Sequence, residues 1–329
     1  MKITYIYRKK NKNGQSIENV FNTIINQLEK YNTIDIIYYE NNLFNFIVKI
    51  LRSKSDIFHI TGDINFLSIF TRIFNKKTIT TIHDLGHYKN LTGIKKLTYF
   101  IFWIQLPILF SHIITSISKY TIDDITNISK FKKNKIKLVY NPLQSGFIYH
   151  PKELNYSKPV ILIVGTEIHK NILATINALK GINCELHIIG KLSNIQIEQL
   201  KISGIQYKNK YNIDNAELLN FYINSDILSF QSKHEGFGLP IIEAQALGRL
   251  VLCSKCCSIP EIAANGAVYC NADDLNDLKE KFNFVLNIKN ANFVNKIIEN
   301  GLNNSKNYNA KIISENYYNL YNNVLNEKI

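Results

Sequence analysis

The chain has 329 residues, of which 46% are hydrophobic and 20% are charged, and its formal net charge is +13. This length favours two domains of about 150 residues each, and the composition excludes a disordered or collagen-like chain. Residues 1–155 hold 22 Lys and Arg against 10 Asp and Glu, whereas residues 156–329 hold 17 against 16. The first half is therefore expected to attract anionic partners, such as lipid headgroups, phosphorylated acceptors or nucleic acid.

The N-terminal sequence, MKITYIYRKKNKNG, has a short apolar run followed by charges and contains no small-residue cleavage site. This pattern is typical of a first strand rather than a signal peptide, so we expect a cytoplasmic protein. Five cysteines at irregular spacing argue against a disulfide framework. The CSKCC sequence at 253–257 resembles half of a zinc site but has no second pair, which favours buried thiols.

Short β-branched runs alternate with helical patterns from the first residue, as is typical of parallel βαβ units. Helical patterns are found, for example, at 17–30 and 119–129. The predicted strands of the first half are 2–8, 34–39, 57–60, 78–82, 112–117 and 135–140.

The sequence YFIFWIQLPILFSHIITSI, residues 99–117, is apolar for almost the length of a membrane span. Polar residues and Pro107 interrupt it, so a span is disfavoured. We expect instead a helix that is buried or partly apposed to a bilayer, with Trp103 at the interface and Lys95 and Lys96 beside the apolar face.

Residues 141–159 contain two prolines near their ends and have little periodicity, which indicates a linker. The predicted organisation is an N-terminal domain at 1–145, a linker at 146–159, a C-terminal domain at 160–310 and a last helix at 311–329 that could cross back to the first domain. The predicted strands of the second half are 160–165, 184–190, 205–207, 226–230, 250–254 and 267–270.

Two successive doubly wound α/β domains are thus predicted, each with a parallel sheet. Ligands of such sheets bind beyond the carboxyl ends of the strands, so we expect the site in a cleft between the domains.

The most informative stretch is KHEGFGLPIIEAQALGR, residues 233–249. It follows a predicted strand, and Pro240 is suited to the first turn of a helix that stops near Gly248. Glu235 is then expected on the loop, and Glu243 about one turn into the helix.

The backbone of Gly236, Phe237, Gly238 and Leu239 can approach a ligand closely, and the helix N-terminus behind it favours negative charge. A phosphate fits there, but carboxylates do not bind phosphate directly. We therefore expect Glu235 and Glu243 to accept hydrogen bonds from hydroxyls on either side of a pyrophosphate, which describes a nucleotide sugar.

The longer sequence EGFGLPIIEAQALGRLVLCSKCCSIPEIAANGA resembles the donor-binding signature of retaining glycosyltransferases of family four, which have the GT-B fold. This resemblance implies that Glu235 lies near the donor hexose as a catalytic residue and that Glu243 holds the ribose. It also assigns the backbone of Gly236, Phe237, Gly238 and Leu239 to the donor-binding loop.

Two further motifs resemble the same family. IVGTEIHKNI places Lys170 on the family's diphosphate-contacting lysine, although His169 stands where arginine is commoner, and IIGKL places Lys191 where a second base is often found. Two cations can stabilise the charge on the leaving diphosphate. Because they could do so without a metal, we expect a metal-independent enzyme with no cofactor other than the nucleotide-sugar co-substrate.

In the first half, TTIHDLGHY resembles the family's loop with an active-site histidine. This makes His83 the candidate for contacting the donor sugar or the acceptor hydroxyl, with Asp84 either orienting it or capping the next helix. RKKNKNGQSIENVF resembles the loop that closes over the donor phosphate, where Gly14 would approach the ligand. Many relatives have two glycines there, and this chain has one.

The resemblance implies transfer of a hexose from a nucleoside diphosphate sugar to a hydroxyl of a glycan or lipid-linked glycan, with retention, in bacterial surface polysaccharide biosynthesis. The basic first domain would present the acceptor and contact the anionic inner face of the cytoplasmic membrane. Two alternatives are a nucleotide-sugar epimerase on the same fold and a non-enzymatic nucleic-acid binder. Nucleic acid is not expected as a partner, because no basic-aromatic motif is recognised and the diphosphate site is intact.

Overall fold

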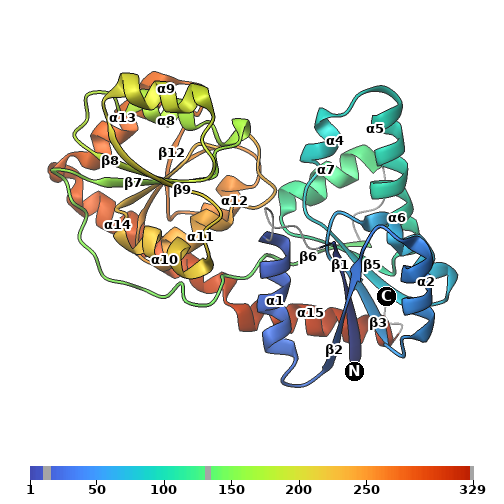
Figure 1. Ribbon diagram of the computed structural model, residues 1–329. Helices are drawn as coiled ribbons and strands as arrows, with labels where there is room; N and C mark the ends of the chain where they lie inside the picture. The colour runs from blue at the N-terminus through green and yellow to red at the C-terminus, as the bar shows by residue number, and fades with distance from the viewer. Residues whose placement is uncertain (10–15, 130–134, 327–329) are drawn as a thin grey trace. The chain divides into compact units, whose positions relative to one another are not determined.

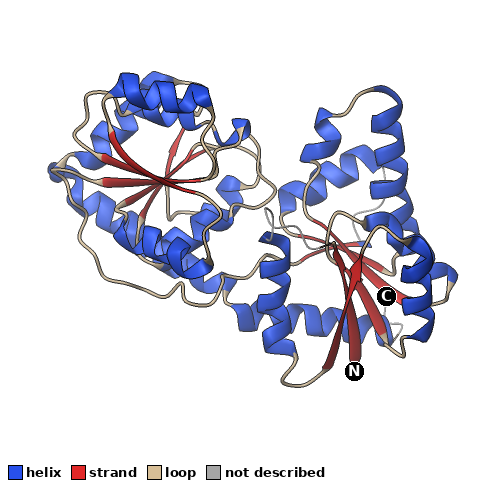
Figure 2. Ribbon diagram, in the orientation of Figure 1, coloured by secondary structure: helices blue, strands red, loops and turns tan. Residues whose placement is uncertain are grey.

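The computed structural model describes residues 1–9, 16–129 and 135–326. Gly14, one of the predicted donor-binding residues, lies outside them. The described chain forms two compact units, Met1–Gln144 with Asn309–Ile329, and Ser145–Tyr308. Each contains a six-stranded sheet, and the strand pairs are parallel (Figure 2). The predicted fold class, two doubly wound α/β domains, is confirmed.

The first sheet has the strand order β2-β1-β3-β4-β5-β6 (Figure 1). Its strands are β1 (Lys2–Arg8), β2 (Thr33–Tyr39), β3 (Ile57–Ile60), β4 (Lys77–Ile82), β5 (Ile113–Ser116) and β6 (Ile136–Leu138). The described helical elements of the first unit are α1 (Ser16–Leu28), α2 (Leu43–Arg52), η1 (Asn65–Leu67), α3 (Ser68–Ile73), α4 (Gly86–Asn90), α5 (Gly93–Tyr99), η2 (Phe100–Gln105), α6 (Leu106–Phe110), α7 (Lys119–Ser129) and α15 (Ala310–Leu325).

The second sheet has the strand order β12-β11-β10-β7-β8-β9. Its strands are β7 (Val160–Val164), β8 (Glu185–Ile189), β9 (Gln206–Lys210), β10 (Ile227–Phe230), β11 (Leu250–Ser254) and β12 (Val268–Cys270). The helical elements of the second unit are η4 (Ile168–Lys170), α8 (Ile172–Ala178), α9 (Asn194–Ser203), α10 (Asn215–Asn224), α11 (Leu239–Ala246), α12 (Ile259–Ala263), α13 (Leu275–Leu286), η5 (Ile288–Asn290), α14 (Ala291–Ser305) and η6 (Lys306–Tyr308).

Helices cover both faces of the second sheet, with α8, α9 and α13 on one face and α10, α11 and α14 on the other (Figure 1). Because both faces are covered, its central strands are buried and consist of continuous apolar runs. β11 is buried at all five positions, and β10 at all four. The carboxyl ends of these strands carry the loops that hold the predicted site.

The last helix, α15, belongs to the first unit and packs against α1 (Figure 1). Its Tyr321 hydroxyl lies 2.8 Å from the Tyr5 hydroxyl and 2.7 Å from Nδ1 of His59. The other ring nitrogen of His59 lies 2.8 Å from the Thr81 hydroxyl. Burial lowers the pKa of His59 to about 3, so the ring is neutral and serves as a structural connector.

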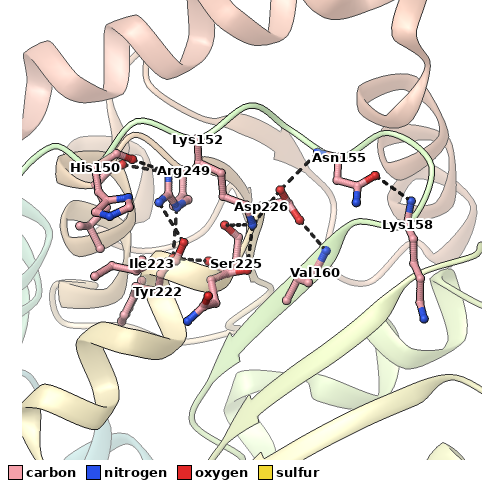
Figure 3. A network of polar contacts seen from close by, with 12 residues as sticks. His150, Lys152, Asn155, Lys158, Val160, Tyr222, Ile223, Ser225, Asp226 and Arg249 are labelled. Atoms are coloured by element: carbon pink, nitrogen blue, oxygen red, sulfur yellow. Dashed lines mark hydrogen bonds and ion pairs between the residues drawn. The ribbon is translucent and has the colours of Figure 1, made fainter.

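A buried arginine connects residues 146–159, the predicted linker, to the rest of the second unit. The Arg249 guanidinium donates to the carbonyls of Tyr222, Ile223 and His150 at 3.1, 3.0 and 3.0 Å (Figure 3). The side chain is 2% exposed, and these carbonyl acceptors compensate for the lost hydration of its charge.

Asp226 makes a second set of contacts with the same segment. Its carboxylate accepts from the backbone N–H groups of Val160 and Asn155 at 2.8 and 3.2 Å and lies 3.0 Å from Lys152 Nζ (Figure 3). Arg249 and Asp226 therefore attach the segment before β7 to the sheet that carries the site.

Candidate functional site

The loop between β10 and α11 turns sharply at a glycine. Gly238 occupies the N-cap position of α11 with a φ of 110°. A side chain is strained in this conformation, and a Cβ there would lie 3.1 Å from Cδ1 of Ile241. The glycine lets the loop enter the helix directly, so Glu235 stays on the loop while Glu243 lies within the helix, as predicted.

Glu235 forms an ion pair with Lys170. Its Oε1 lies 2.5 Å from Lys170 Nζ, and the two side chains are 12% and 16% exposed. Lys170 belongs to η4, which follows β7, and its Nζ also lies 5.0 Å from the centre of the Phe230 ring at the end of β10. Two predicted site residues 65 positions apart are thus brought into direct contact.

The backbone holds these two loops together. The Lys233 N–H donates to the carbonyl of His169 at 2.8 Å. Gly165, which follows β7 with a φ of 93°, leaves space for the lysine stem, because a Cβ there would lie 2.9 Å from Cε of Lys170. The position of the Lys170 ammonium therefore depends on a glycine that the sequence motif already contained.

Lys191 is exposed and follows β8, next to the Lys170 loop. Its carbonyl accepts a hydrogen bond from the Thr166 hydroxyl at 2.7 Å. Gly190 has a φ of 133°, and a Cβ there would lie 2.7 Å from the Thr166 side chain. Thr166 joins the loops of the two predicted diphosphate-binding lysines, and no sequence pattern indicates this contact.

Glu243 is 3% exposed, and its Oε2 accepts a hydrogen bond from the Tyr222 hydroxyl at 2.7 Å. Burial raises the pKa of Glu243 to about 7, although the bond from Tyr222 opposes this shift. Among the described residues, Oε1 makes no hydrogen bond. This oxygen is the one that can accept from a ligand hydroxyl.

Ser258, which follows strand β11, contacts the loop between β10 and α11, residues 231–238, called the donor loop below. Its hydroxyl lies 3.0 Å from the carbonyl of Glu235 and 2.9 Å from that of Phe237. Ser258 is the N-cap residue of α12, but its side chain makes no cap bond to that helix. Phe237 is buried and its ring packs edge-on against Tyr308, so only its backbone belongs to the loop surface.

His83 follows β4 in the first unit, and its Nε2 lies 2.7 Å from the carbonyl of Thr61. The carbonyl can only accept, so Nε2 carries the proton. Burial lowers the pKa of His83, which leaves Nδ1 of the neutral ring as a proton acceptor. Asp84 accepts from the N–H of Gly86, the first residue of α4, at 2.8 Å, and its charge also acts on the nearby His83.

A small pocket of about 110 Å³ adjoins His83. Asp63 is on its wall, where its carboxylate accepts from the Tyr99 hydroxyl at 3.1 Å and its carbonyl accepts from Trp103 Nε1 at 3.1 Å. The Tyr99 and Trp103 rings are stacked, with centroids 5.2 Å apart. Sequence reasoning missed Asp63, because its aromatic partners are about 40 positions away.

Residues 148–304 match the family model of glycosyl transferases group 1. The matched residues make up nearly all of the second unit, Ser145–Tyr308. The enzyme class predicted from the sequence, glycosyltransferase, is confirmed, and the family is consistent with the predicted resemblance. Every predicted site residue of the second unit lies inside the matched region.

Proteins similar to this chain include two curated relatives. One is the O-antigen chain mannosyltransferase RfbU of Salmonella typhimurium, 28% identical over 61% of this chain and 58% of its own length. Another is the N,N'-diacetylbacillosaminyl-diphospho-undecaprenol alpha-1,3-N-acetylgalactosaminyltransferase of Campylobacter jejuni, 24% identical over 53% of this chain and 47% of its own. The matches therefore span about half the length of these relatives.

Among solved structures, Anabaena Alr3699/HepE in complex with UDP and glucose matches with a TM-score of 0.80 at 13% identity. The match covers 98% of this chain and 99% of that one. It shows that the glycosyltransferase has the GT-B fold over both units.

Proposed function

We propose that this protein transfers a hexose from a nucleoside diphosphate sugar to a hydroxyl of a glycan or lipid-linked glycan, with retention at the anomeric carbon. The observation that carries the proposal is the Lys170–Glu235 pair at 2.5 Å, on two loops at the carboxyl ends of β7 and β10. Only 12–16% of these charged side chains is exposed, and Gly165 leaves space for the stem of Lys170 beside Glu235.

The arrangement in the second unit suits a nucleotide sugar. Lys170 supplies a cation for the diphosphate, and Oε1 of Glu243 can accept from a ribose hydroxyl. Lys191 supplies a second cation beside the Lys170 loop. We infer that these two lysines stabilise the charge on the leaving diphosphate, so the reaction proceeds without a metal.

For the chemical step we propose attack from the same face as the leaving group. The acceptor oxygen forms a bond to the anomeric carbon while the bond between that carbon and the diphosphate breaks. The leaving phosphate oxygen takes the proton of the acceptor hydroxyl. The environment of Glu235 supports attack by the acceptor rather than by the protein. The Glu235 carboxylate is paired with Lys170, and this ion pair weakens it as a nucleophile. Nδ1 of His83 would contact the donor sugar or the acceptor hydroxyl.

The acceptor class follows from charge and from the relatives. Residues 1–155 carry an excess of 12 positive charges, which fits a phosphorylated or lipid-linked acceptor. RfbU is named for O-antigen chains, and the Campylobacter relative is named for a diphospho-undecaprenol. We propose that the enzyme acts in bacterial surface polysaccharide biosynthesis, at the inner face of the cytoplasmic membrane.

The function is tested by incubating the protein with UDP-, GDP-, ADP- and CDP-hexoses, with and without a polyprenyl diphosphate-linked N-acetylhexosamine. We expect one nucleotide to release its diphosphate faster when the acceptor is present, and NMR of the product to show the anomeric configuration of the donor. Interconversion of sugars without acceptor would instead identify an epimerase. Nucleic-acid binding unaffected by all four diphosphates, without sugar transfer, would contradict the proposal.

A membrane contact is proposed for the helical segment that runs from α5 to α6. The stretch Gly93–Phe110 is apolar and long enough to cross a membrane, and 17% of it is buried. Ile94, Leu97 and Leu109 are 82%, 58% and 51% exposed, and Lys95 is exposed beside them. An apolar face with flanking lysines is typical of a helix that lies in an anionic bilayer surface.

Replacing both Ile94 and Leu97 by aspartate is expected to weaken binding to vesicles that contain anionic phospholipid by about tenfold or more, because apolar area no longer enters the bilayer. Vesicle flotation measures this. The matched control is Ile195→Asp with Ile202→Asp, since these α9 isoleucines are 67% and 66% exposed in the second unit. Equal loss of binding in both double variants would contradict the proposal.

A further inference from the structure

The segment that follows β11 holds the donor loop in place at several points. The Ser254 hydroxyl donates to the carbonyl of Ser232 at 2.6 Å, and the Cys256 thiol lies 3.4 Å from the same carbonyl. Ser258 then contacts the carbonyls of Glu235 and Phe237. Residues 256 and 257 therefore lie within the segment that contacts the loop carrying Glu235.

Cys256 and Cys257 are neighbours in sequence, and their sulfur atoms are 3.3 Å apart. All five cysteines are thiols, and Cys184, Cys253 and Cys270 are buried, whereas this pair is partly exposed. The Cys256 thiol donates to the Cys257 sulfur. This bond, together with burial, raises the pKa of Cys256, so Cys257 is the better nucleophile of the two.

Small molecules can reach the pair. Cys256 lines a pocket of about 520 Å³ at the carboxyl ends of β11 and β12, together with Lys233, Lys255 and Asp273. Nδ1 of His234 lies 3.7 Å from the Cys257 sulfur. The two thiols are thus close to each other, accessible, and surrounded by polar and basic groups.

We propose that Cys256 and Cys257 form a dithiol modification site that a peroxide closes to a disulfide between neighbouring residues. The Cys257 sulfur attacks one oxygen of hydrogen peroxide, which gives a sulfenic acid and one water. The Cys256 sulfur then displaces the hydroxyl of that sulfenic acid, which leaves with the thiol proton as a second water. Both thiols are oxidised, and the peroxide is reduced.

The geometry makes this disulfide reversible. Consecutive Cα atoms are about 3.8 Å apart, which is shorter than the usual 4.4–6.8 Å across a disulfide. The bond is therefore strained and easily reduced, as in labile regulatory disulfides rather than structural ones. The sulfur atoms must also approach from 3.3 Å to about 2.0 Å.

Closure would disturb the donor loop. It draws the Cys256 sulfur away from the carbonyl of Ser232 and moves the backbone next to Ser258, which holds Glu235. We expect the oxidised protein to bind its nucleoside diphosphate more weakly. This consequence rests on the proposed function, whereas the thiol chemistry does not.

The test treats the full chain with hydrogen peroxide and measures its intact mass. Wild type is expected to lose the mass of two hydrogen atoms and to recover it with dithiothreitol, while Cys256→Ser and Cys257→Ser gain oxygen or stay unchanged. Cys270→Ser is the control, because the Cys270 sulfur lies 3.4 Å from the carbonyl of Cys253 and these two residues are the other cysteines that are close together. This variant should still lose the mass of two hydrogen atoms on peroxide treatment.

Two further measurements keep the test decisive. Phenylarsine oxide, which bridges two thiols, should add to wild type and to Cys270→Ser but not to Cys256→Ser, whether or not nucleotide binds. Oxidised wild type should then lose stabilisation by the diphosphate. Mass loss retained in Cys256→Ser, or no mass loss in wild type, would overturn the proposal. Absence of nucleotide binding in reduced wild type would count against the proposed function alone.

Discussion

Lys170→Met is expected to lower kcat/KM for sugar transfer by about 100- to 1,000-fold, the usual loss when one preorganised group that stabilises developing charge is removed. Methionine retains an apolar stem that can pack over Phe230, so the change removes mainly the charge. The loss should fall mostly on kcat, because the lysine acts on charge that grows as the diphosphate leaves. Transfer kinetics at saturating donor measure it.

Controls separate catalysis from structure. Lys208→Met removes another lysine of the second unit, on β9, where its ammonium lies 2.9 Å from Glu185. It should leave kcat/KM within about twofold, as expected for a surface substitution. Lys170→Met leaves Glu235 without its ion-pair partner, so any loss of thermal stability should come from that unpaired charge. The double variant Lys170→Met with Glu235→Gln removes both charges and should recover the thermal stability but not the activity. Activity within twofold of wild type in Lys170→Met would contradict the proposed role.

Glu243 is expected to make stability depend on pH. Its folded pKa of about 7 lies above the unfolded value near 4.5, so the neutral group favours folding. This contribution is complete below about pH 4.5 and is lost as pH rises through 7. Relative to Glu243→Gln, which does not titrate, wild type should therefore lose about 3 kcal/mol of unfolding free energy between about pH 4 and pH 8. Urea denaturation of both proteins across this range measures it.

The control for this measurement is Glu198→Gln, which alters an exposed glutamate of α9. Its stability difference from wild type should change little over the same range. If the Glu243→Gln difference is equally constant, folding does not raise the pKa of Glu243, and the buried neutral form at neutral pH is ruled out.

The same carboxylate should link pH to nucleotide binding. A hydroxyl donates better to an ionised oxygen, so stabilisation by the preferred diphosphate should grow as pH rises through 7. A ligand at a hundred times its dissociation constant stabilises by about 2.7 kcal/mol, and Glu243→Ala should lose much of this. Full stabilisation in Glu243→Ala would contradict its predicted contact with the ribose.

The sequence predicted the site best where the residues are close together in the chain. Glu235, Gly238 and Glu243 lie within nine positions, and strand, glycine turn and helix follow from local rules, so their arrangement was predictable. The strands also appeared at the expected places, because runs buried on both faces have few polar interruptions. Lys170 could be assigned only through its resemblance to a family motif.

The hydrogen-bond partners that hold these site residues in place could not be predicted. Tyr222 reaches Glu243 from the preceding helix α10, and nothing in its local pattern indicates this contact. Ser258 stands at the N-cap position of α12, but its hydroxyl contacts two loop carbonyls and makes no cap bond to that helix. Such contacts depend on how elements pack across the sheet, which hydrophobic periodicity does not specify.

The placement of α15 also affects the order of folding. Residues 145–308 form one uninterrupted unit, but the first unit needs residues from both sides of it. During synthesis, the second unit can therefore close its core before the first one can. Until α15 has been made, Tyr5 and His59 lack the hydroxyl of Tyr321, and the face that they share stays open to chaperones or to other chains.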